Sequence, residues 1–144
     1  MSRPQQIVID TSTLVGAMLH PDSVPRRAFL TAVRIGELCV TEATMQELQE
    51  VLQRPKFDRF IPLQDRLDFL TLVSGHVSMW EIHVSSEQAA TGVCRDDKDT
   101  KFLSLALSCR ADVLISSDGD LLVLHPWQGV PILTPSAFLE KVNS

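Results

Sequence analysis

The chain of 144 residues contains no tyrosine, only three cysteines and no long apolar run. The cysteines, Cys39, Cys94 and Cys109, are odd in number and irregularly spaced, which excludes a disulfide framework and predicts free thiols in a reducing cytoplasm. Because no apolar run approaches the length that spans a bilayer, we expect no membrane association. The polar residues 1–6 lead directly into an apolar segment, so we expect no signal peptide there.

Positive charge is also scarce, with 13 Lys and Arg against 18 Asp and Glu and a formal net charge of −5. This balance argues against a protein that coats nucleic acid by charge alone. It agrees with a concentrated acidic site, where a bound cation reverses the local sign. Hydrophobic residues make up 44% and charged residues 22%, as in ordinary globular chains. The length and the absence of a repeat or linker predict one domain over residues 1–144.

Strands and helices are predicted to alternate along the chain. Short apolar runs predict strands at residues 7–9, 38–40, 113–115 and 130–133, and alternation of apolar and polar residues predicts an edge strand at 79–84. Between them, helical periodicity or start and stop signals predict helices. We expect a three-layer α/β/α domain with a mostly parallel sheet of about five strands and right-handed crossovers.

Several helix boundaries are predicted from single residues. Ser12 or Thr13 is expected to cap the first helix, and Thr41 the helix at 42–53. Gly36 is expected to end the helix that begins near Pro25. In the helix between Pro62 and Gly75, the expected apolar side consists of Leu63, Leu67, Leu70 and Val73.

Four carboxylates occupy positions that bring them toward one crevice. Asp10 and Asp118 each follow a buried strand, and these two strands can be neighbours in a doubly wound sheet. Asp99 precedes an amphipathic helix, and Glu47 lies at the edge of the apolar stripe of another. The structural alternative is that aspartates cap helices and fill turns, and we prefer it for Asp97 and Asp112. Glu47 taken alone would be a solvated helix glutamate.

Gathered carboxylates repel one another unless a cation lies among them. Mg²⁺ and Mn²⁺ take oxygen ligands, often one or two carboxylates completed by water and substrate phosphates. Such ions activate water and stabilise the leaving oxygen in phosphodiester cleavage. The acidic set therefore predicts a site for a hard cation and chemistry on phosphodiesters.

Four stretches of this sequence resemble the PIN-domain family, in particular its bacterial VapC-like toxins of toxin–antitoxin pairs. The stretches are residues 8–12, 41–52 with Glu47 inside, 95–106 and 116–122, and the close at 132–139 is also similar. Each is weak alone, but their order and spacing over nearly the whole chain are fairly specific. Many members carry Asn where this chain has Ser12, whose hydroxyl still hydrogen-bonds a carboxylate but lacks the two-sided reach of an amide.

The resemblance implies a ribonuclease of the PIN fold that depends on Mg²⁺ or Mn²⁺. It also implies an RNA substrate, a cognate antitoxin and a homodimer. By position, the catalytic and metal-binding set is Asp10, Glu47, Asp99 and Asp118. Auxiliary roles fall to Asp96, Asp120, Thr11, Ser12 and Ser116.

Two lysines beside the acidic set are the best candidates for binding the phosphate backbone of a nucleic acid. Lys98 and Lys101 flank Asp99 and are preferred over the other basic residues considered, which are Arg26, Arg27, Arg54, Lys56, Arg59 and Arg95. Trp80 and Trp127 are able to stack on bases, but buried aromatics are more common.

Other classes of site fit the sequence less well. A haloacid-dehalogenase-like phosphatase would need a second aspartate two residues after Asp10, where Ser12 stands. A dinucleotide site would need a glycine-rich turn after the first strand. Zinc would need clustered Cys and His, and the four histidines are scattered. A non-catalytic PIN-fold module that binds nucleic acid or protein, or an acidic partner-binding domain, stays as the alternative to a nuclease.

Overall fold

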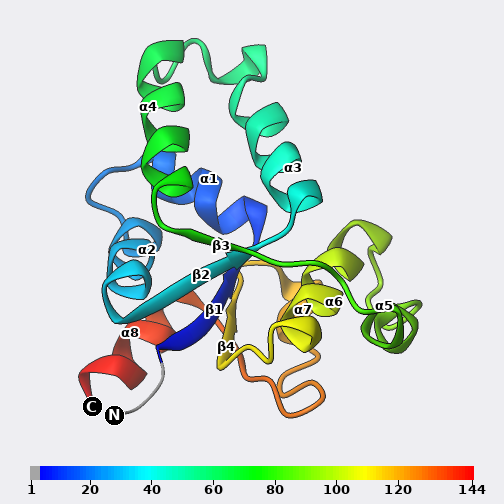
Figure 1. Ribbon diagram of the computed structural model, residues 1–144. Coiled ribbons are helices and arrows are strands. Elements are labelled where there is room, and N and C mark those ends of the chain that lie inside the picture. Colours follow the sequence, from blue (N-terminus) through cyan, green and yellow to red (C-terminus); the bar gives the residue numbers. More distant parts are fainter. Residues whose placement is uncertain (1–3) are drawn as a thin grey trace.

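The computed structural model describes residues 4–144, in which a five-stranded, entirely parallel sheet lies between two layers of helices (Figure 1). The strand order is β3-β2-β1-β4-β5. The strands are β1 (Gln5–Ile9), β2 (Gly36–Val40), β3 (Val77–Met79), β4 (Val113–Ile115) and β5 (Ile132–Leu133). Because β1 pairs with both β2 and β4, the strands that precede Asp10 and Asp118 are neighbours, the arrangement that the sequence left open for a doubly wound sheet.

Helices cover both faces of the sheet, which confirms the predicted three-layer fold. One face carries α1 (Thr11–Leu19), α2 (Val24–Ile35), α3 (Glu42–Leu52), α4 (Leu63–Ser74) and α8 (Pro135–Asn143). The other carries α5 (Val84–Ala90), α6 (Thr100–Ser108) and α7 (Gly119–Leu122). Short 3₁₀ turns, η1 (Pro55–Phe57) and η2 (Asp97–Asp99), precede α4 and α6. In Figure 1, α3 and α4 form a hairpin that protrudes above the sheet.

The central strands are buried on both faces because their side chains alternate between two cores. Ile7 and Ile9 belong to the core beneath α1 and α2, whereas Val8 belongs to the core beneath α6. All three are at most 5% exposed. Burying one such side chain contributes roughly 1.5–3 kcal/mol, so the continuous apolar run of β1 fixes the centre of the sheet.

Helix boundaries follow the predicted signals except at α1. Gly36 ends α2, and Thr41 caps α3 in a reciprocal arrangement with Thr44. The cap of α1 is Asp10, whose Oδ1 accepts the backbone N–H of Thr13 at 3.0 Å, so the prediction of Ser12 or Thr13 was wrong. The helix begins directly at the end of β1, which leaves both of those residues inside its first turn.

The edge strand was predicted in the wrong place. It spans Val77–Met79, not residues 79–84, and pairs only with β2 among the described strands. The backbone N–H of Trp80 still donates to the Val40 carbonyl at 2.8 Å, and the chain leaves the sheet after this residue. Trp80 and Ile82 alternate because they pack against the core beneath α6, not because the segment pairs as a strand.

The buried stripe of α4 also differs from the expected one. The helix buries Arg66, Phe69 and Val73, whereas Leu63 is 47% exposed. The helix is therefore rotated relative to the expected orientation, and an arginine occupies a core position.

None of the helices in the described residues is long and apolar enough to cross a membrane. The prediction about the N-terminal segment falls partly on residues 1–3, which lie outside the described residues. Cys39, Cys94 and Cys109 are buried, and none of the three forms a disulfide.

Candidate active site at the carboxyl edge of the sheet

A cavity of about 550 Å³ opens at the carboxyl edge of the sheet, where β1 and β4 end. The chain turns from β1 into a helix on one face and from β4 into a helix on the other. Such a switch point is where open parallel sheets bind ligands. The four predicted carboxylates, Asp10, Glu47, Asp99 and Asp118, all line this cavity.

Asp10 is nearly inaccessible, with 2% of its surface exposed. Its carboxylate accepts hydrogen bonds from the Thr13 N–H at 3.0 Å, the Ser12 hydroxyl at 3.4 Å and the Ser116 hydroxyl at 2.5 Å. Burial raises the pKa of Asp10, hydrogen bonds from Ser116 and Thr13 lower it, and the charge of Asp118 raises it further. Ser12 therefore contacts Asp10, although many members of the family that this sequence resembles carry asparagine at that position.

Ser116 joins the ends of the two central strands. Its side chain is fully buried, and its Oγ accepts the Asp118 N–H at 2.9 Å while donating to Asp10. Asp118 in turn accepts the N–H of Asp120 through Oδ1 at 2.9 Å and caps α7. Ser116 therefore links the Asp10 carboxylate to the backbone of Asp118 through its hydroxyl.

Asp99 and Asp118 meet in space, as their places in the sequence predicted. The pKa of Asp99 is raised to about 7, first by burial and then by the hydrogen bond to Asp118 and the charge of Asp118. Asp96 and Asp10 add smaller contributions of the same sign. Asp99 therefore retains its proton to higher pH than an isolated aspartate does.

Glu47 lies on the α3 side of the cavity and forms an ion pair with Lys101 of α6. Lys101 also donates to the Lys98 carbonyl at 2.6 Å. Of the two lysines predicted to bind nucleic acid, Lys98 lines the cavity, whereas the ammonium of Lys101 is paired with the Glu47 carboxylate.

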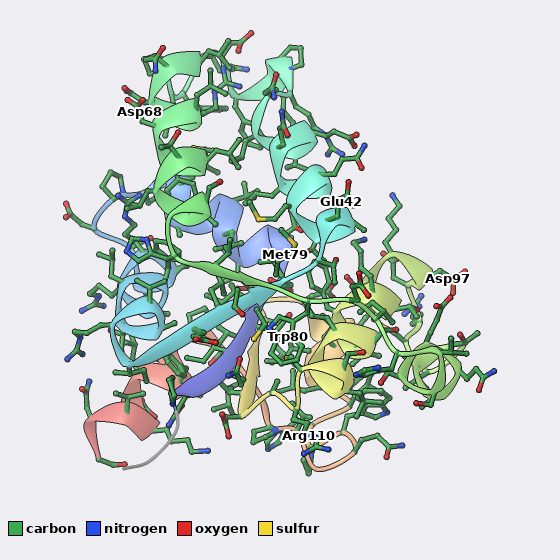
Figure 2. The ribbon with its side chains drawn as sticks, in the orientation of Figure 1. Glu42, Asp68, Met79, Trp80, Asp97 and Arg110 are labelled. Carbon is green, nitrogen blue, oxygen red and sulfur yellow. The ribbon has the colours of Figure 1, made fainter. Side chains whose placement is uncertain are left out.

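The auxiliary residues occupy different positions around the acids. Thr11, Ser12 and Asp96 line the cavity, and Asp96 also accepts the Lys98 N–H at 2.9 Å. Asp120 supports Asp118 through its backbone. Figure 2 shows the Asp97 side chain directed away from the sheet, which agrees with its interpretation as an ordinary turn residue.

Asp112 also has the structural role that we preferred. Its Oδ2 accepts the Gln6 N–H at 2.8 Å, and Asp112 precedes β4, at the amino edge of the sheet. It is therefore separated from the cavity by the length of the strand.

The donor set of the cavity fits a hard cation. Across residues 4–144, no group of three or more Asp, Glu, His or Cys side chains is arranged to hold a metal ion. The acids nevertheless supply only oxygen donors, and burial, with a smaller contribution from neighbouring carboxylates, raises the pKa values of Asp10 and Asp99, so their ionised forms are poorly stabilised without a cation. Mg²⁺ and Mn²⁺ bind through one or two carboxylates with other oxygens completing the shell.

Some contributors to the site were missed from the sequence. Cys94 directs its thiol toward Asp99 Oδ2 at 3.9 Å and the Asp120 carbonyl at 3.6 Å, and Thr13 contacts the Ser117 hydroxyl at 3.1 Å. Arg54 and Lys56 also line the cavity; both were candidates from the sequence but were ranked below the lysines beside Asp99. Their position immediately after the helix that carries Glu47 was the available signal.

Known proteins resemble this chain in sequence and in fold. The chain is 25% identical over 147 residues to the uncharacterized protein MJ1680 of Methanocaldococcus jannaschii, an alignment that covers 94% of this chain and 90% of that one. The structure is similar to PAE2754 from Pyrobaculum aerophilum, with a TM-score of 0.67, 17% identity and coverage of 97% and 91% of the two chains.

A second similar structure is VapBC2 from Rickettsia felis bound to a DNA fragment from their promoter. The TM-score is 0.64 at 9% identity, with 89% of this chain and 97% of that chain covered. A family model described as the PIN domain matches residues 6–120. These residues include all four cavity carboxylates and the strands that place them, and the resemblance predicted from the sequence is confirmed: the chain belongs to the PIN domain family, a family of nucleases.

Proposed function

We propose that this protein is an endoribonuclease that requires Mg²⁺ or Mn²⁺ and hydrolyses RNA phosphodiester bonds at Asp10, Glu47, Asp99 and Asp118. The observation that carries the proposal is the gathering of Asp10, Asp99 and Asp118 in one cavity, where the pKa of Asp99 is raised to about 7. Like charges concentrated at a topological switch point favour a cationic ligand. Membership of a nuclease family supports phosphodiesters as the substrate class.

The proposed roles follow from the hydrogen bonds of the site. Asp10, Asp99 and Asp118 would hold the cation, and Glu47 would contribute a further carboxylate from α3. When bound at these residues, Mg²⁺ or Mn²⁺ would activate a water and stabilise the leaving oxygen. Ser116 keeps Asp10 and the Asp118 backbone in a fixed relation, while Ser12 and the Thr13 N–H hold the second oxygen of Asp10. Thr11 and Asp96 shape the wall, and Asp120 supports Asp118.

The proposed biological role is the toxin of a toxin–antitoxin pair. The similar Rickettsia felis structure is a VapBC2 complex, and its likeness to this chain supports a cognate antitoxin as the protein partner. We further propose a homodimer in the cytoplasm, where the three buried cysteines remain reduced.

A non-catalytic PIN-fold binding module is the second candidate function. The observation that favours it is the Glu47–Lys101 ion pair, which commits one of the four carboxylates to a neighbouring ammonium. In a nuclease, either this ion pair must dissociate when the cation binds, or Lys101 must only reduce the net negative charge of the cavity before the cation binds.

A cleavage assay separates the two candidates. End-labelled single-stranded RNA is incubated with the protein in Mg²⁺, in Mn²⁺ and in EDTA, beside the variants Asp118→Asn and Asp97→Asn. Both variants remove one carboxylate charge, but Asp97 is exposed and outside the cavity. We expect cleavage only with metal and a loss of more than about 100-fold in Asp118→Asn alone, the scale of removing one preorganised electrostatic group. Cleavage that persists in EDTA, or equal loss in both variants, would contradict the proposal, and metal binding without cleavage would favour the binding module.

A further inference from the structure

The connection between α3 and α4 places two cationic side chains on the wall of the acidic cavity. Arg54 and Lys56 are exposed and line the cavity together with the four carboxylates. Within the described residues, neither has a carboxylate at ion-pair distance, in contrast to Lys101. Their charges are therefore available to an anion that enters the cavity.

A buried arginine holds this connection in place. Arg66 of α4 has no exposed surface, and its guanidinium donates to the carbonyls of Leu52 at 2.9 Å, Arg54 at 3.2 Å and Ile61 at 3.2 Å. It also forms an ion pair with Asp58. The planar fork of arginine donors suits several fixed acceptors at once, so one side chain connects the end of α3, the middle of the connection and the start of α4.

Lys56 is further restrained by an aromatic ring. Its Nζ lies 5.2 Å from the centroid of Phe57, which is buried and lines the same cavity. A cation–π contact of this kind contributes modestly at an exposed site but defines where the ammonium lies. The backbone at Arg54 and the ammonium of Lys56 are therefore both restrained at the cavity wall.

We propose that Arg54 and Lys56 form a phosphate-binding rim that holds the backbone of single-stranded RNA over the acidic cavity, and that Arg66 is the positioning residue of this rim. The choice of RNA rests on the proposed function. A strand of phosphates approaching clustered carboxylates is repelled, and cations on the wall offset that repulsion. Arginine and lysine are the usual phosphate ligands of proteins. A cavity of about 550 Å³ has the size of a small-ligand site and can hold a short part of a flexible strand.

The first experiment compares two pairs of charge-removing variants. Arg54→Gln with Lys56→Gln removes the rim, and Arg27→Gln with Arg59→Gln removes two exposed cations that lie outside the cavity. Arg59 is a close control because it belongs to the same connection but stacks 5.3 Å from the Phe60 ring centroid. Binding of a fluorescent 12-nucleotide RNA is measured by anisotropy over a KCl series in Ca²⁺, with a gel to establish that the RNA is intact.

We expect the rim pair to weaken binding about tenfold at 0.1 M KCl and to lower the slope of log K against log salt by about 1.4, the sum for two single-strand phosphate contacts. The control pair should stay within about twofold. In the cleavage assay, the rim pair should raise KM and leave kcat within about twofold. Equal effects of the two pairs, or none from either, would overturn the rim.

The rim and the proposed nuclease fail in different ways. If the parent cleaves RNA and the rim pair behaves like the control, the nuclease stands and the rim is wrong. If the parent cleaves nothing but the rim pair alone loses RNA affinity, the rim stands and the nuclease is wrong.

The role of Arg66 is tested through its exposed partner, because replacing a buried arginine threatens the fold. Asp58→Asn removes the ion pair, and Asp65→Asn removes an equal charge from an exposed position in the first turn of α4. We expect Asp58→Asn to weaken RNA binding about threefold and to raise KM without changing kcat. Asp58→Glu should restore the RNA affinity of the parent. Asp65→Asn should leave the RNA affinity unchanged or slightly higher. Equal behaviour of Asp58→Asn and Asp65→Asn would overturn the positioning role.

Discussion

Two buried charged side chains of this protein, Arg66 and Asp10, have opposite surroundings. Arg66 is inaccessible, and three backbone carbonyls and Asp58 accept its hydrogen bonds. Asp10 is 2% exposed and accepts hydrogen bonds from Ser116, Thr13 and Ser12, but its charged neighbour is another carboxylate, Asp118. The fold provides partners for the whole charge of Arg66, but it satisfies the negative charge of Asp10 only in part.

The difference separates a charge that the fold itself satisfies from one that, under the proposed function, a bound cation would satisfy. A buried charge with complete hydrogen bonding fixes the geometry of the segments that it joins. A buried carboxylate beside like charges is hard to ionise, and a fold retains it at a stability cost where function needs the charge. The surroundings of each group therefore predict how the protein responds when the charge is removed.

The largest effect is expected when the compensated charge is removed. Arg66→Met keeps the apolar stem but leaves the carbonyls of Leu52, Arg54 and Ile61 without their donor. We expect the free energy of unfolding in urea to fall by about 3 kcal/mol, near the lower end of the range for breaking a buried pair, because Asp58 itself is exposed. Arg59→Met on the same connection should change it by less than about 0.5 kcal/mol. A loss below about 1 kcal/mol in Arg66→Met would show that the buried guanidinium is not essential to the hairpin.

A bound cation should supply the compensation that the acidic site lacks. At a free Mg²⁺ concentration one hundred times its dissociation constant, the parent should gain about 2.7 kcal/mol by mass action. Asp10→Asn should be at least as stable as the parent without metal and should gain much less from Mg²⁺, while Asp97→Asn should gain as much as the parent. Thermal melts with and without Mg²⁺ measure this. If Asp10→Asn is clearly less stable without metal and gains equally, Asp10 is only the cap of α1.

The smallest of the three effects is a pH dependence of the metal-free protein. The pKa of Asp99 is raised from 3.8 to about 7 mainly by burial and then by Asp118, so the folded state binds a proton that the unfolded state has released. This contribution to stability is complete below about pH 3.8 and is lost as pH rises through about 7. Because Asp99 is partly exposed, solvent screening reduces the expected size to about 1 kcal/mol.

Urea unfolding in EDTA between pH 5 and pH 8 checks this sign. The parent should lose stability over that window, and Asp99→Asn should lose less, whereas Asp97→Asn should follow the parent. A parent that becomes more stable as pH rises, with Asp99→Asn unchanged, would contradict the raised pKa.

Much of the fold followed from local signals. The continuous apolar runs of β1 and β4, the cap at Thr41 and the stop at Gly36 depend on residues close in sequence, and they predicted most elements and the three layers. The same logic failed at residues 79–84, where alternation reflects packing against α6 instead of strand pairing. Periodicity reports that alternate side chains are buried but not what buries them.

The sequence by itself determined where the carboxylates of the candidate site stand along their elements. Asp10 and Asp118 follow buried strands, and parallel neighbours end at one edge of the sheet for any sequence with this alternation. Only the tertiary structure decided that Lys101 pairs with Glu47, that Arg54 and Lys56 face the cavity, and that Arg66 is buried. Long cationic side chains reach several partners from one backbone position, so their partners are chosen by segments that meet only when the chain has folded.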